Sequence, residues 1–460
     1  MGGLITALNA GKTSLATNQK SIEIVGNNVA NVNTKGYSRQ RAELEQIPSL
    51  NFGNFFVGQG VTVANVQRDH DIFITRQMHR KNIDFGEESG RSTPLSEVER
   101  LINIGDNSIA AEIDRFFDSW QKLSTNPSGL VERDMVIQRG QLLGSAFRTT
   151  MDELNTVRGN INNTILAKID PANEKISRIA ELNERIQLVE SSGQSANAAR
   201  DQRDLLVEEL SGLLGVRSYE DSHGMLALQL PGGLPLVQGK QAMLLQAETD
   251  GSNVNLSVQI AGTSKDIHLS NMGGEMYGLF ETRDVFIGDV AADLDHLAHG
   301  ISVAVNEQHR AGTGLDGSTG LAFFTDLGGV EENAARHLQV ELTDSDQVAA
   351  GLSDAPGDNR NVLNIAALET DYLLDGTDTF DNFYGKVAAK VGIAVSSNKL
   401  ALGGAEDAMV QLRNMRDGIA GVSLEEEMID LIQFQRGFES SAKFLSTIDE
   451  MMGALIELKR

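Results

Sequence analysis

Three groups of residues in this 460-residue chain have types and spacings that could bind a phosphate or a metal ion. The first, Gly11-Lys12-Thr13-Ser14, matches the end of a phosphate-binding P-loop, but Thr6 stands where the motif needs its first glycine. A P-loop also follows a buried strand, and too few residues precede Gly11 to form one. We therefore interpret this string as a polar patch on a helix.

The second group is a pair of histidines, His296 and His299, three residues apart on one predicted helix face. Zinc sites use such spacing, but they need further ligands. The nearby Asp293 and Asp295 could be offered, although helices of an acidic protein carry such groups by chance. We expect no metal to bind here.

The third group is an acidic cluster around Gly376. It lacks the order of ligands of an EF-hand and the closing glutamate, so a solvated loop is the better interpretation, with calcium binding left open. The four members are Asp371, Asp375, Asp378 and Asp381.

Composition narrows the function further. The chain has no cysteine, which excludes disulfides, thiolate catalysis and cysteine-based zinc sites. Its 64 acidic and 39 basic residues give a net charge of −25, which disfavours nucleic acid and anionic membranes. No apolar run of about eighteen residues predicts membrane insertion, and the first residues do not form a cleavable signal peptide. No Gly-x-Ser-x-Gly elbow occurs. We expect no enzyme, no catalytic residue, no metal and no cofactor.

One string is more specific than any of these: Asn27-Asn28-Val29-Ala30-Asn31-Val32-Asn33-Thr34-Lys35-Gly36-Tyr37-Ser38-Arg39-Gln40. Asparagine and glycine tolerate left-handed backbone, and asparagine side chains satisfy the free groups at a helix end. The string therefore predicts that a helix ends here and that the chain turns. A plain helix cap does not explain so specific a pattern.

The residues before this turn repeat apolar positions with a period of 3.5, as in a coiled coil. Between residues 1 and 33 only Lys12, Lys20 and Glu23 are charged, so the helix needs more than one neighbour. Seven of nine stripe positions are apolar: Leu4, Leu8, Gly11, Leu15, Asn18, Ile22, Val25, Val29 and Val32.

The C-terminal residues carry the same spacing. Ser423, with Glu426 three residues on, predicts the capping-box start of a helix. Both chain ends are thus predicted to be amphipathic helices of about 30–35 residues that pair with each other and keep apolar surface for further copies. Eight of ten C-terminal stripe positions are apolar: Leu424, Met428, Leu431, Gln435, Phe438, Ala442, Leu445, Asp449, Met452 and Ile456.

Between the ends, the chain is predicted to be mostly helical. Residues 92–125 and 131–190 have helical spacing, and Pro171 should kink or break the second run. A shorter helix with Asp201 is expected to end near Gly215.

Short strands and turns interrupt these helices. Residues 216–272 contain the strictly alternating run Val254–Ile260, which predicts an inserted β domain. Residues 311–358 are rich in glycine and aspartate, and a strand candidate at His337–Leu342 indicates that they rejoin it.

We therefore expect an α+β multidomain fold with paired terminal coiled-coil helices, a long-helix bundle body and an inserted small β domain. The terminal helical polymerisation domain takes residues 1–34 plus 421–460. The mainly helical body takes 35–215 plus 275–310 plus 359–420, and the outer β domain takes 216–274 plus 311–358.

The asparagine-rich string resembles the N-terminal signature of flagellar rod, hook and hook-associated proteins. Its end, Gly36-Tyr37-Ser38-Arg39-Gln40, is similar to the hook-associated protein 1 (FlgK) family in particular. Other stretches resemble later blocks of that family in order, so that the resemblance spans nearly the whole chain. They are Val57–Val61, Arg68–Phe73, Ala199–Leu206, Gly273–Leu279, Val305–His309, Gly357–Asn359, Ser423–Glu427, Gln433–Gln435 and Ser441–Lys443.

The chain departs from the family pattern at two places. Lys35 stands where the family often has proline, and Arg436-Gly437-Phe438 replaces the usual Ala-Tyr pairing. Gly437 should weaken a helix interior by about 1 kcal/mol relative to alanine.

The resemblance implies a structural subunit of the bacterial flagellum at the hook-filament junction, secreted through the flagellum's own type III export channel. Implied partners are other copies of the chain in a ring, the hook protein, the second hook-filament junction protein, and a cytoplasmic export chaperone on the C-terminal helix. The alternatives are hook protein, rod protein or the second junction protein, and a secreted adhesin. A β-dominated middle would favour hook protein, and surface binding without a flagellum would favour an adhesin.

The terminal helices are expected to form the assembly interface. In the monomer we expect about the first 33 and about the last 40 residues to be mobile, since neither helix can bury its stripe alone. The residues that we assign to the interface are Leu4, Leu8, Leu15, Ile22, Val25, Val29, Asn28, Asn31, Gly36, Tyr37, Leu424, Met428, Leu431, Phe438, Ala442, Leu445 and Met452.

Overall fold

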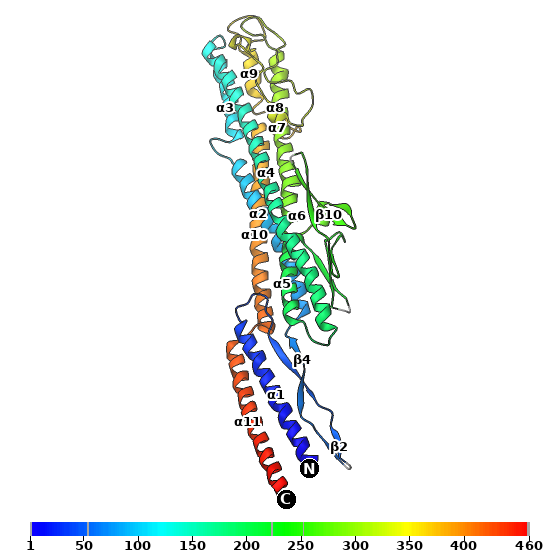
Figure 1. Cartoon of the computed structure of the whole chain (residues 1–460). Coiled ribbons are helices and arrows are strands. Elements are labelled where there is room, and N and C mark those ends of the chain that lie inside the picture. The colour runs from blue at the N-terminus through cyan, green and yellow to red at the C-terminus, as the bar shows by residue number, and fades with distance from the viewer. Residues whose placement is uncertain (1, 53–54, 222–223, 252, 458–460) are drawn as a thin grey trace.

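The molecule is a long rod of helices with a pair of terminal helices at one end (Figure 1). The computed structural model describes residues 2–52, 55–221, 224–251 and 253–457. The predicted domain ranges also include residues 1, 53–54, 222–223, 252 and 458–460, which lie outside these residues. The fold is α+β and mainly helical, as the sequence predicts.

The end of the rod that carries both termini consists of two helices and a hairpin. Helices α1 (Gly2–Ala30) and α11 (Leu424–Glu457) pack against each other in opposite directions, which confirms the predicted pairing. On the other side of α1 lies an antiparallel hairpin of β1 (Gln40–Gln46) and β4 (Val61–Arg68). Strands β2 (Leu50–Phe52) and β3 (Phe55–Val57) extend it. The sequence patterns did not predict this hairpin. We call these elements the terminal unit.

The rest of the rod is built on long helices. Some of them begin at a capping side chain, as at Asp71, whose carboxylate accepts hydrogen bonds from the second and third backbone N–H groups of α2. Gly215, with a φ of +70°, ends α5 near the predicted residue. The main body helices are α2 (Ile72–Leu101), α3 (Ile109–Thr125), α4 (Leu130–Glu190), α5 (Asn197–Leu214), α6 (Gly274–Glu281), α7 (Ile287–Arg310) and α10 (Phe380–Ala420). A π-helical turn at Thr282–Phe286 joins α6 to α7.

Two glycines let α2 approach its neighbours very closely. A Cβ atom on Gly86 would lie 1.9 Å from the carbonyl oxygen of Gly212 in α5, and one on Gly90 would lie 2.3 Å from that of Glu275 in α6. Only glycine fits at such contacts. The predicted break at Pro171 does not occur, because α4 continues through this residue as one helix of 61 residues.

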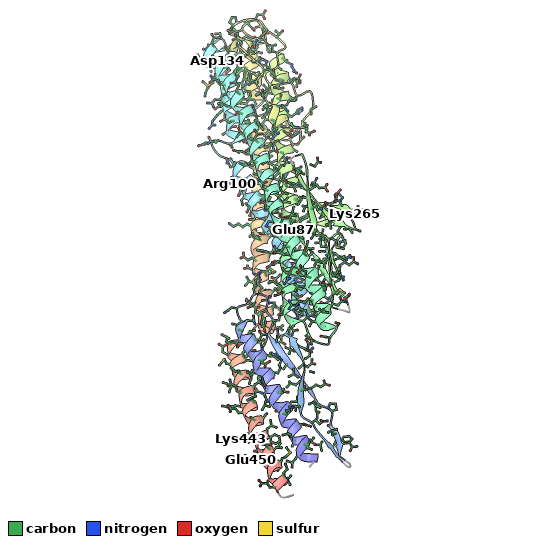
Figure 2. All side chains as sticks on the ribbon, viewed as in Figure 1. Glu87, Arg100, Asp134, Lys265, Lys443 and Glu450 are labelled. Carbon is green, nitrogen blue, oxygen red and sulfur yellow. The ribbon has the colours of Figure 1, made fainter. Side chains whose placement is uncertain are left out.

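The inserted strands form two small antiparallel sheets beside α4. One has β5 (Arg217–Glu220), β6 (Leu226–Gln229), β7 (Pro235–Gln238) and β8 (Gln241–Ala242) in that order. The other has β10 (Asn253–Ile260) between β9 (Leu245–Asp250) and β11 (Thr263–Ile267), followed by a 3₁₀ turn at Leu269–Asn271. The predicted strand Val254–Ile260 is therefore confirmed as part of β10. Figure 2 shows Lys265 on this outer sheet.

Residues 311–358 do not add strands to these sheets. The predicted strand at His337–Leu342 is wrong, since α8 (Ala334–His337) is helical and Val340 makes only a single bridge, to Phe324. A 3₁₀ turn (Ser345–Gln347) and α9 (Arg360–Ala367) follow. The segment covers the end of the rod opposite the terminal unit, where the rings of Phe323 and Phe324 lie 5.6 and 5.5 Å from that of Phe116 in α3.

Candidate assembly interface

Helices α1 and α11 meet along a seam of small residues. A Cβ atom on Gly11 would lie 2.8 Å from Cδ2 of Leu445, and one on Gly437 would lie 2.5 Å from Oδ1 of Asn18. Because glycine has no side chain, each of these positions lets the facing helix approach closely. Gly437, which breaks the family pattern, is thus a contact point between the two helices.

Hydrogen bonds connect α1 to α11 on one side and to the hairpin on the other. The hydroxyl oxygens of Ser14 and Ser441 are 2.9 Å apart across the seam. On the hairpin side, the hydroxyl of Thr17 donates to the carbonyl of Val61 at 3.1 Å. The string Gly11-Lys12-Thr13-Ser14 lies inside α1, as expected for a polar patch on a helix, and two of its members face α11.

At the top of the seam, Asn28 joins three segments of the chain. Its amide nitrogen donates to the carbonyl of Gln40 and to a carboxylate oxygen of Glu427, both at 2.9 Å. Its oxygen accepts from the hydroxyl of Tyr37 at 2.8 Å and from the backbone N–H of Gln40 at 3.0 Å. Asn28 is 1% exposed, so this complete set of partners removes the cost of burying an amide.

Beside Asn28 lies an ion cluster in which Arg39 and Glu427 are buried, while the other two acids reach solvent. The guanidinium of Arg39 binds Glu427 at 2.6 Å, Glu426 at 2.7 Å and Asp430 at 3.1 Å. All three acids belong to the first two turns of α11, where a negative charge interacts favourably with the helix dipole. The predicted capping box is only half formed. The hydroxyl of Ser423 accepts a hydrogen bond from the backbone N–H of Glu426 at 3.5 Å, but the carboxylate of Glu426 binds Arg39.

The same string connects the terminal unit to the body. The backbone N–H of Ser38 donates to Asp201 of α5 at 3.1 Å, and Arg68 at the end of β4 binds the same carboxylate at 2.8 Å. Gly36, with a φ of +81°, turns the chain where it passes close to Leu205. We call the cluster of Asn28, Tyr37, Arg39 and Glu427 the elbow.

Tyr37 keeps its proton within the elbow. Burial raises the pKa of its hydroxyl to about 12, and the carboxylates of Asp201 and Glu427 act in the same direction. The protonated hydroxyl can then donate to Asn28 throughout the physiological pH range.

The seam between α1 and α11 follows the predicted heptad stripes only in part. Gly11 and Asn18 on α1 and Leu445 on α11 are stripe positions that make close contacts across the seam. Ser14, Gly437 and Ser441, which also meet there, lie outside the stripes. Among the predicted interface residues, Val25 and Asn28 are buried, and Leu424 and Met428 are exposed. The others are half-buried: Leu4, Leu8, Leu15, Ile22, Val29, Asn31, Gly36, Tyr37, Leu431, Phe438, Ala442, Leu445 and Met452.

Several residues of this region were not singled out from the sequence. Arg39 and Glu427 form the ion pair of the elbow. The features of the sequence that could have indicated this pair are the arginine near the end of the asparagine-rich string and the three glutamates at the start of the last helix. The remaining missed residues are large apolar side chains that the terminal unit exposes: Ile5, Leu44, Leu50, Phe56, Ile429, Ile432, Phe444, Met451 and Leu455.

In both candidate metal sites, side chains lie close to other charged side chains. His296 lies 3.4 Å from Glu331 and 3.5 Å from Asp375, and Asp378 of the acidic cluster binds Lys386 at 2.7 Å. Among the residues that the structure describes, no three histidine or acidic side chains come together in a way that could hold a metal ion.

Comparison with protein families identifies the chain. The model described as the flagellar hook-associated protein FlgK helical domain matches residues 95–324, which is half of the chain. The chain belongs to the FlgK family. Two further models match the terminal parts of the chain: the flagella basal body rod protein model matches residues 8–37, and the C-terminal model of flagellar basal body rod FlgEFG proteins matches residues 419–458.

Full-length relatives agree with this assignment. The chain is 28% identical to flagellar hook-associated protein 1 of Bacillus subtilis, over 99% of this chain and 98% of the relative. It is 24% identical to that of Escherichia coli, over 98% and 99% of the two chains. The flagellar hook junction protein FlgK of Burkholderia pseudomallei has a similar fold, with a TM-score of 0.67 and 15% identity, over 75% of this chain and 100% of that one. Within the described part of the chain, every helix is too short or too polar to cross a membrane.

Proposed function

We propose that this chain is the structural subunit that joins the flagellar hook to the filament, held in a ring of copies by its terminal helices. Family membership supports a structural role in the flagellum, outside the cell, and not an enzymatic one. The observation that carries the proposal is that α1 and α11 pair through small and polar residues and leave their predicted apolar stripes partly uncovered.

The uncovered stripes are the source of the assembly energy. Leu424 and Met428 are 46% and 49% exposed in the single chain. Fully burying one leucine or methionine contributes about 1.5–3 kcal/mol before the cost of ordering. Single exposed apolar residues are ordinary, but a row of them along one helix pair is typical of a protein interface.

The two ends of the rod are assigned to different partners. In our proposal the terminal unit meets other copies and the hook protein, and the body carries torque toward the second junction protein and the filament. The β insertion at residues 216–274 faces outward. An export chaperone holds the C-terminal helix in the cytoplasm, because the exposed apolar side chains of that helix need cover before assembly.

Deletion of residues 1–33 tests the proposal. The main hydrophobic core includes no residue of α1 or α11, so the shortened chain should keep the helical circular dichroism of the body. Electron microscopy of cells that produce it should show hooks without filaments, with flagellin shed into the medium.

A milder variant separates assembly from folding. Leu424→Ser with Met428→Ser changes two exposed side chains and should leave the thermal unfolding of the purified chain unchanged, while filaments are lost. The matched control, Lys443→Ser with Glu450→Ser, also changes exposed residues of α11 and should keep filaments (Figure 2). Normal filament attachment in cells that produce only the chain without residues 1–33 would refute the proposal.

A further inference from the structure

The terminal unit meets the body at a joint that three chain segments cross, at residues 31–39, 69–71 and 421–423. Among the described residues, none of the buried apolar clusters contains side chains from both parts. Polar contacts therefore hold the joint closed. Opening it would break hydrogen bonds and ion pairs without dividing an apolar core.

The first turns of α5 supply the main contacts across the joint. The side-chain amide of Asn197 donates to the backbone carbonyl of Val66 at 2.7 Å. Arg68, the last residue of β4, binds Asp201 at 2.8 Å and Asp204 at 2.7 Å. Only 11% of the Arg68 side chain and 7% of the Asp201 side chain are exposed, so salt and water screen this ion pair only weakly.

Two histidines face this ion cluster across a small cavity. The cavity of about 40 Å³ lies between the end of β4, the first turns of α2, α5 and α10. His79 of α2 lines it and is half-buried, whereas His70, just after β4, also lines it but is more exposed. The cavity has room for only a few water molecules, so a positive charge on His79 would be poorly solvated.

The charged groups around His79 come from each neighbouring element. Three carboxylates of α5 face the cavity, and each already has a basic partner: Arg68 binds the first two, and Arg413 of α10 lies 3.8 Å from the third. Tyr37, beside the first carboxylate, keeps its proton. The ionisable groups that line the cavity are Arg68, His70, His79, Asp201, Asp204, Glu208 and Arg416, and Asp71 follows His70.

The closed joint resists protonation of both histidines. Burial lowers the pKa of each from 6.5, and nearby positive groups act in the same direction, Arg68 on His70 and His70 on His79. Asp204 opposes this change without cancelling it. In an open joint both rings are hydrated and regain their ordinary pKa. The closed form is therefore fully stable above pH 6.5 and loses stability as the pH falls below it.

From this arrangement we propose that the joint is an acid-sensitive latch: when His79 and His70 take up protons, α5 releases β4 and the terminal unit moves relative to the body. The terminal unit stays attached through the three crossing segments, two of which contain a glycine, Gly36 and Gly421. Each part keeps its own fold, because the seam of α1 and α11 and the main core lie on opposite sides of the joint. The inference concerns the single chain and holds whether or not the chain joins a ring.

Spin labels on introduced cysteines test the latch, because the native chain has no cysteine. One labelled pair, Lys443→Cys on α11 with Lys265→Cys on the outer sheet, spans the joint, and both positions are exposed (Figure 2). The matched control pair, Arg100→Cys with Lys265→Cys, lies within the body. Pulsed electron spin resonance measures the distance within each pair between pH 7.5 and pH 5.

For the pair that spans the joint, we expect the fraction of molecules with a changed distance to rise about ten-fold over this range, with a midpoint below pH 6.5. The body pair should not change. His70→Gln with His79→Gln replaces both rings by neutral side chains and should abolish the response. If this double variant does not fold, His70→Gln alone, at an exposed position, should reduce the response.

Four outcomes would overturn the latch. They are a constant distance across the joint in the native chain, an equal response in the native chain and the histidine variants, a midpoint as low as pH 4, and an equal change in the body pair. The third would assign the movement to groups other than these histidines. The fourth would show that the body loses its fold and that no movement is confined to the joint.

Discussion

Asn28 shows how one side chain can determine the geometry of a chain reversal. Several asparagines stand in the string between residues 27 and 33, and from the sequence all of them could cap the helix. In the structure only Asn28 is buried and reaches α11, whereas Asn31 bonds back to Asn27 of its own turn. The sequence therefore identified the string but not the residue within it, because selection among equivalent caps depends on the partner helix.

A carboxylate should not be able to replace the side-chain amide of Asn28. Asn28→Asp would place a carboxylate oxygen where an N–H group now lies 2.9 Å from Glu427, so two donor bonds are lost and two like charges meet. We expect a loss of about 3 kcal/mol in the local stability of the elbow. Hydrogen exchange at the backbone amide of Gln40, which donates to Asn28, measures this loss. The control Asn31→Asp should change it little, and equal effects of the two variants would contradict the role of Asn28.

His309 makes the far end of the body sensitive to acid. It is fully buried, its Nδ1 lies 2.7 Å from the carbonyl of Leu321, and its Nε2 accepts the N–H of Ala349 at 3.0 Å, so the ring is held neutral. Burial lowers the pKa of His309 from 6.5 to about 4. Below pH 6.5 the unfolded chain takes up a proton that the folded chain does not, so stability is complete above this pH and falls as the pH drops towards 4.

The expected loss across that window is about 3 kcal/mol, and urea unfolding at pH 7 and pH 4.5 measures most of it. Other groups also titrate there, so the test is a comparison of variants. His309→Gln should reduce the difference between the two pH values, while the exposed control His337→Gln should leave it unchanged. An identical pH dependence in all three proteins would show that His309 does not titrate as described.

At the scale of elements, two glycines of α11 should respond to alanine in opposite ways. Gly437→Ala places a Cβ atom 2.5 Å from Asn18, so the gain in helix propensity of about 1 kcal/mol should be outweighed and the pairing with α1 weakened. A Cβ atom on Gly453 would meet nothing within 4 Å, so Gly453→Ala should stabilise α11 by up to about 1 kcal/mol. Hydrogen exchange of α1 and α11 distinguishes the two, and stabilisation by Gly437→Ala would contradict the close contact.

Periodicity in the sequence predicted the terminal helices but only part of the seam between them. A heptad stripe shows which side of a helix is apolar, and stripe positions such as Gly11 and Leu445 do meet across the seam. Gly437 and Ser441 also form the seam, and a search for apolar spacing overlooks them. The cause is physical: the apolar stripe identifies the largest gain from burial, and in this chain part of the stripe, including Leu424 and Met428, stays exposed in the single molecule.

Strands were harder to predict than helices for a related reason. In the hairpin, β1 is largely solvent-exposed. The apolar alternation of β4 is limited to Val61 and Val63 before a bulge shifts the register, so it is shorter than the run that marks a half-buried strand. The false strand at His337–Leu342 has the opposite explanation. Its start belongs to α8, which packs against α4 and α7, and the side chain of Asn306 accepts the backbone N–H groups of Phe323 and Phe324 that a sheet would otherwise pair.

For the whole molecule, stability should be distributed unevenly between the body and the terminal unit. The main core contains no residue of α1 or α11, and the buried apolar side chains described in these helices are Ile24, Val25 and Ile448. In a dilute monomer we expect the amides of α1 and α11 to exchange with deuterium at least ten-fold faster than those of α4 and α7. Equal protection of the two regions, measured by mass spectrometry, would contradict assembly-dependent ordering of the chain ends.

The uninterrupted course of α4 through Pro171 has a mechanical consequence. A helix of 61 residues is roughly 90 Å long, and it behaves as a beam that runs along most of the body. Proline has no N–H group, so the carbonyl of Ala167 lacks its usual partner at this one point of the beam. Elastic bending under load should therefore concentrate at Pro171, so this otherwise stiff helix has one fixed position at which it bends.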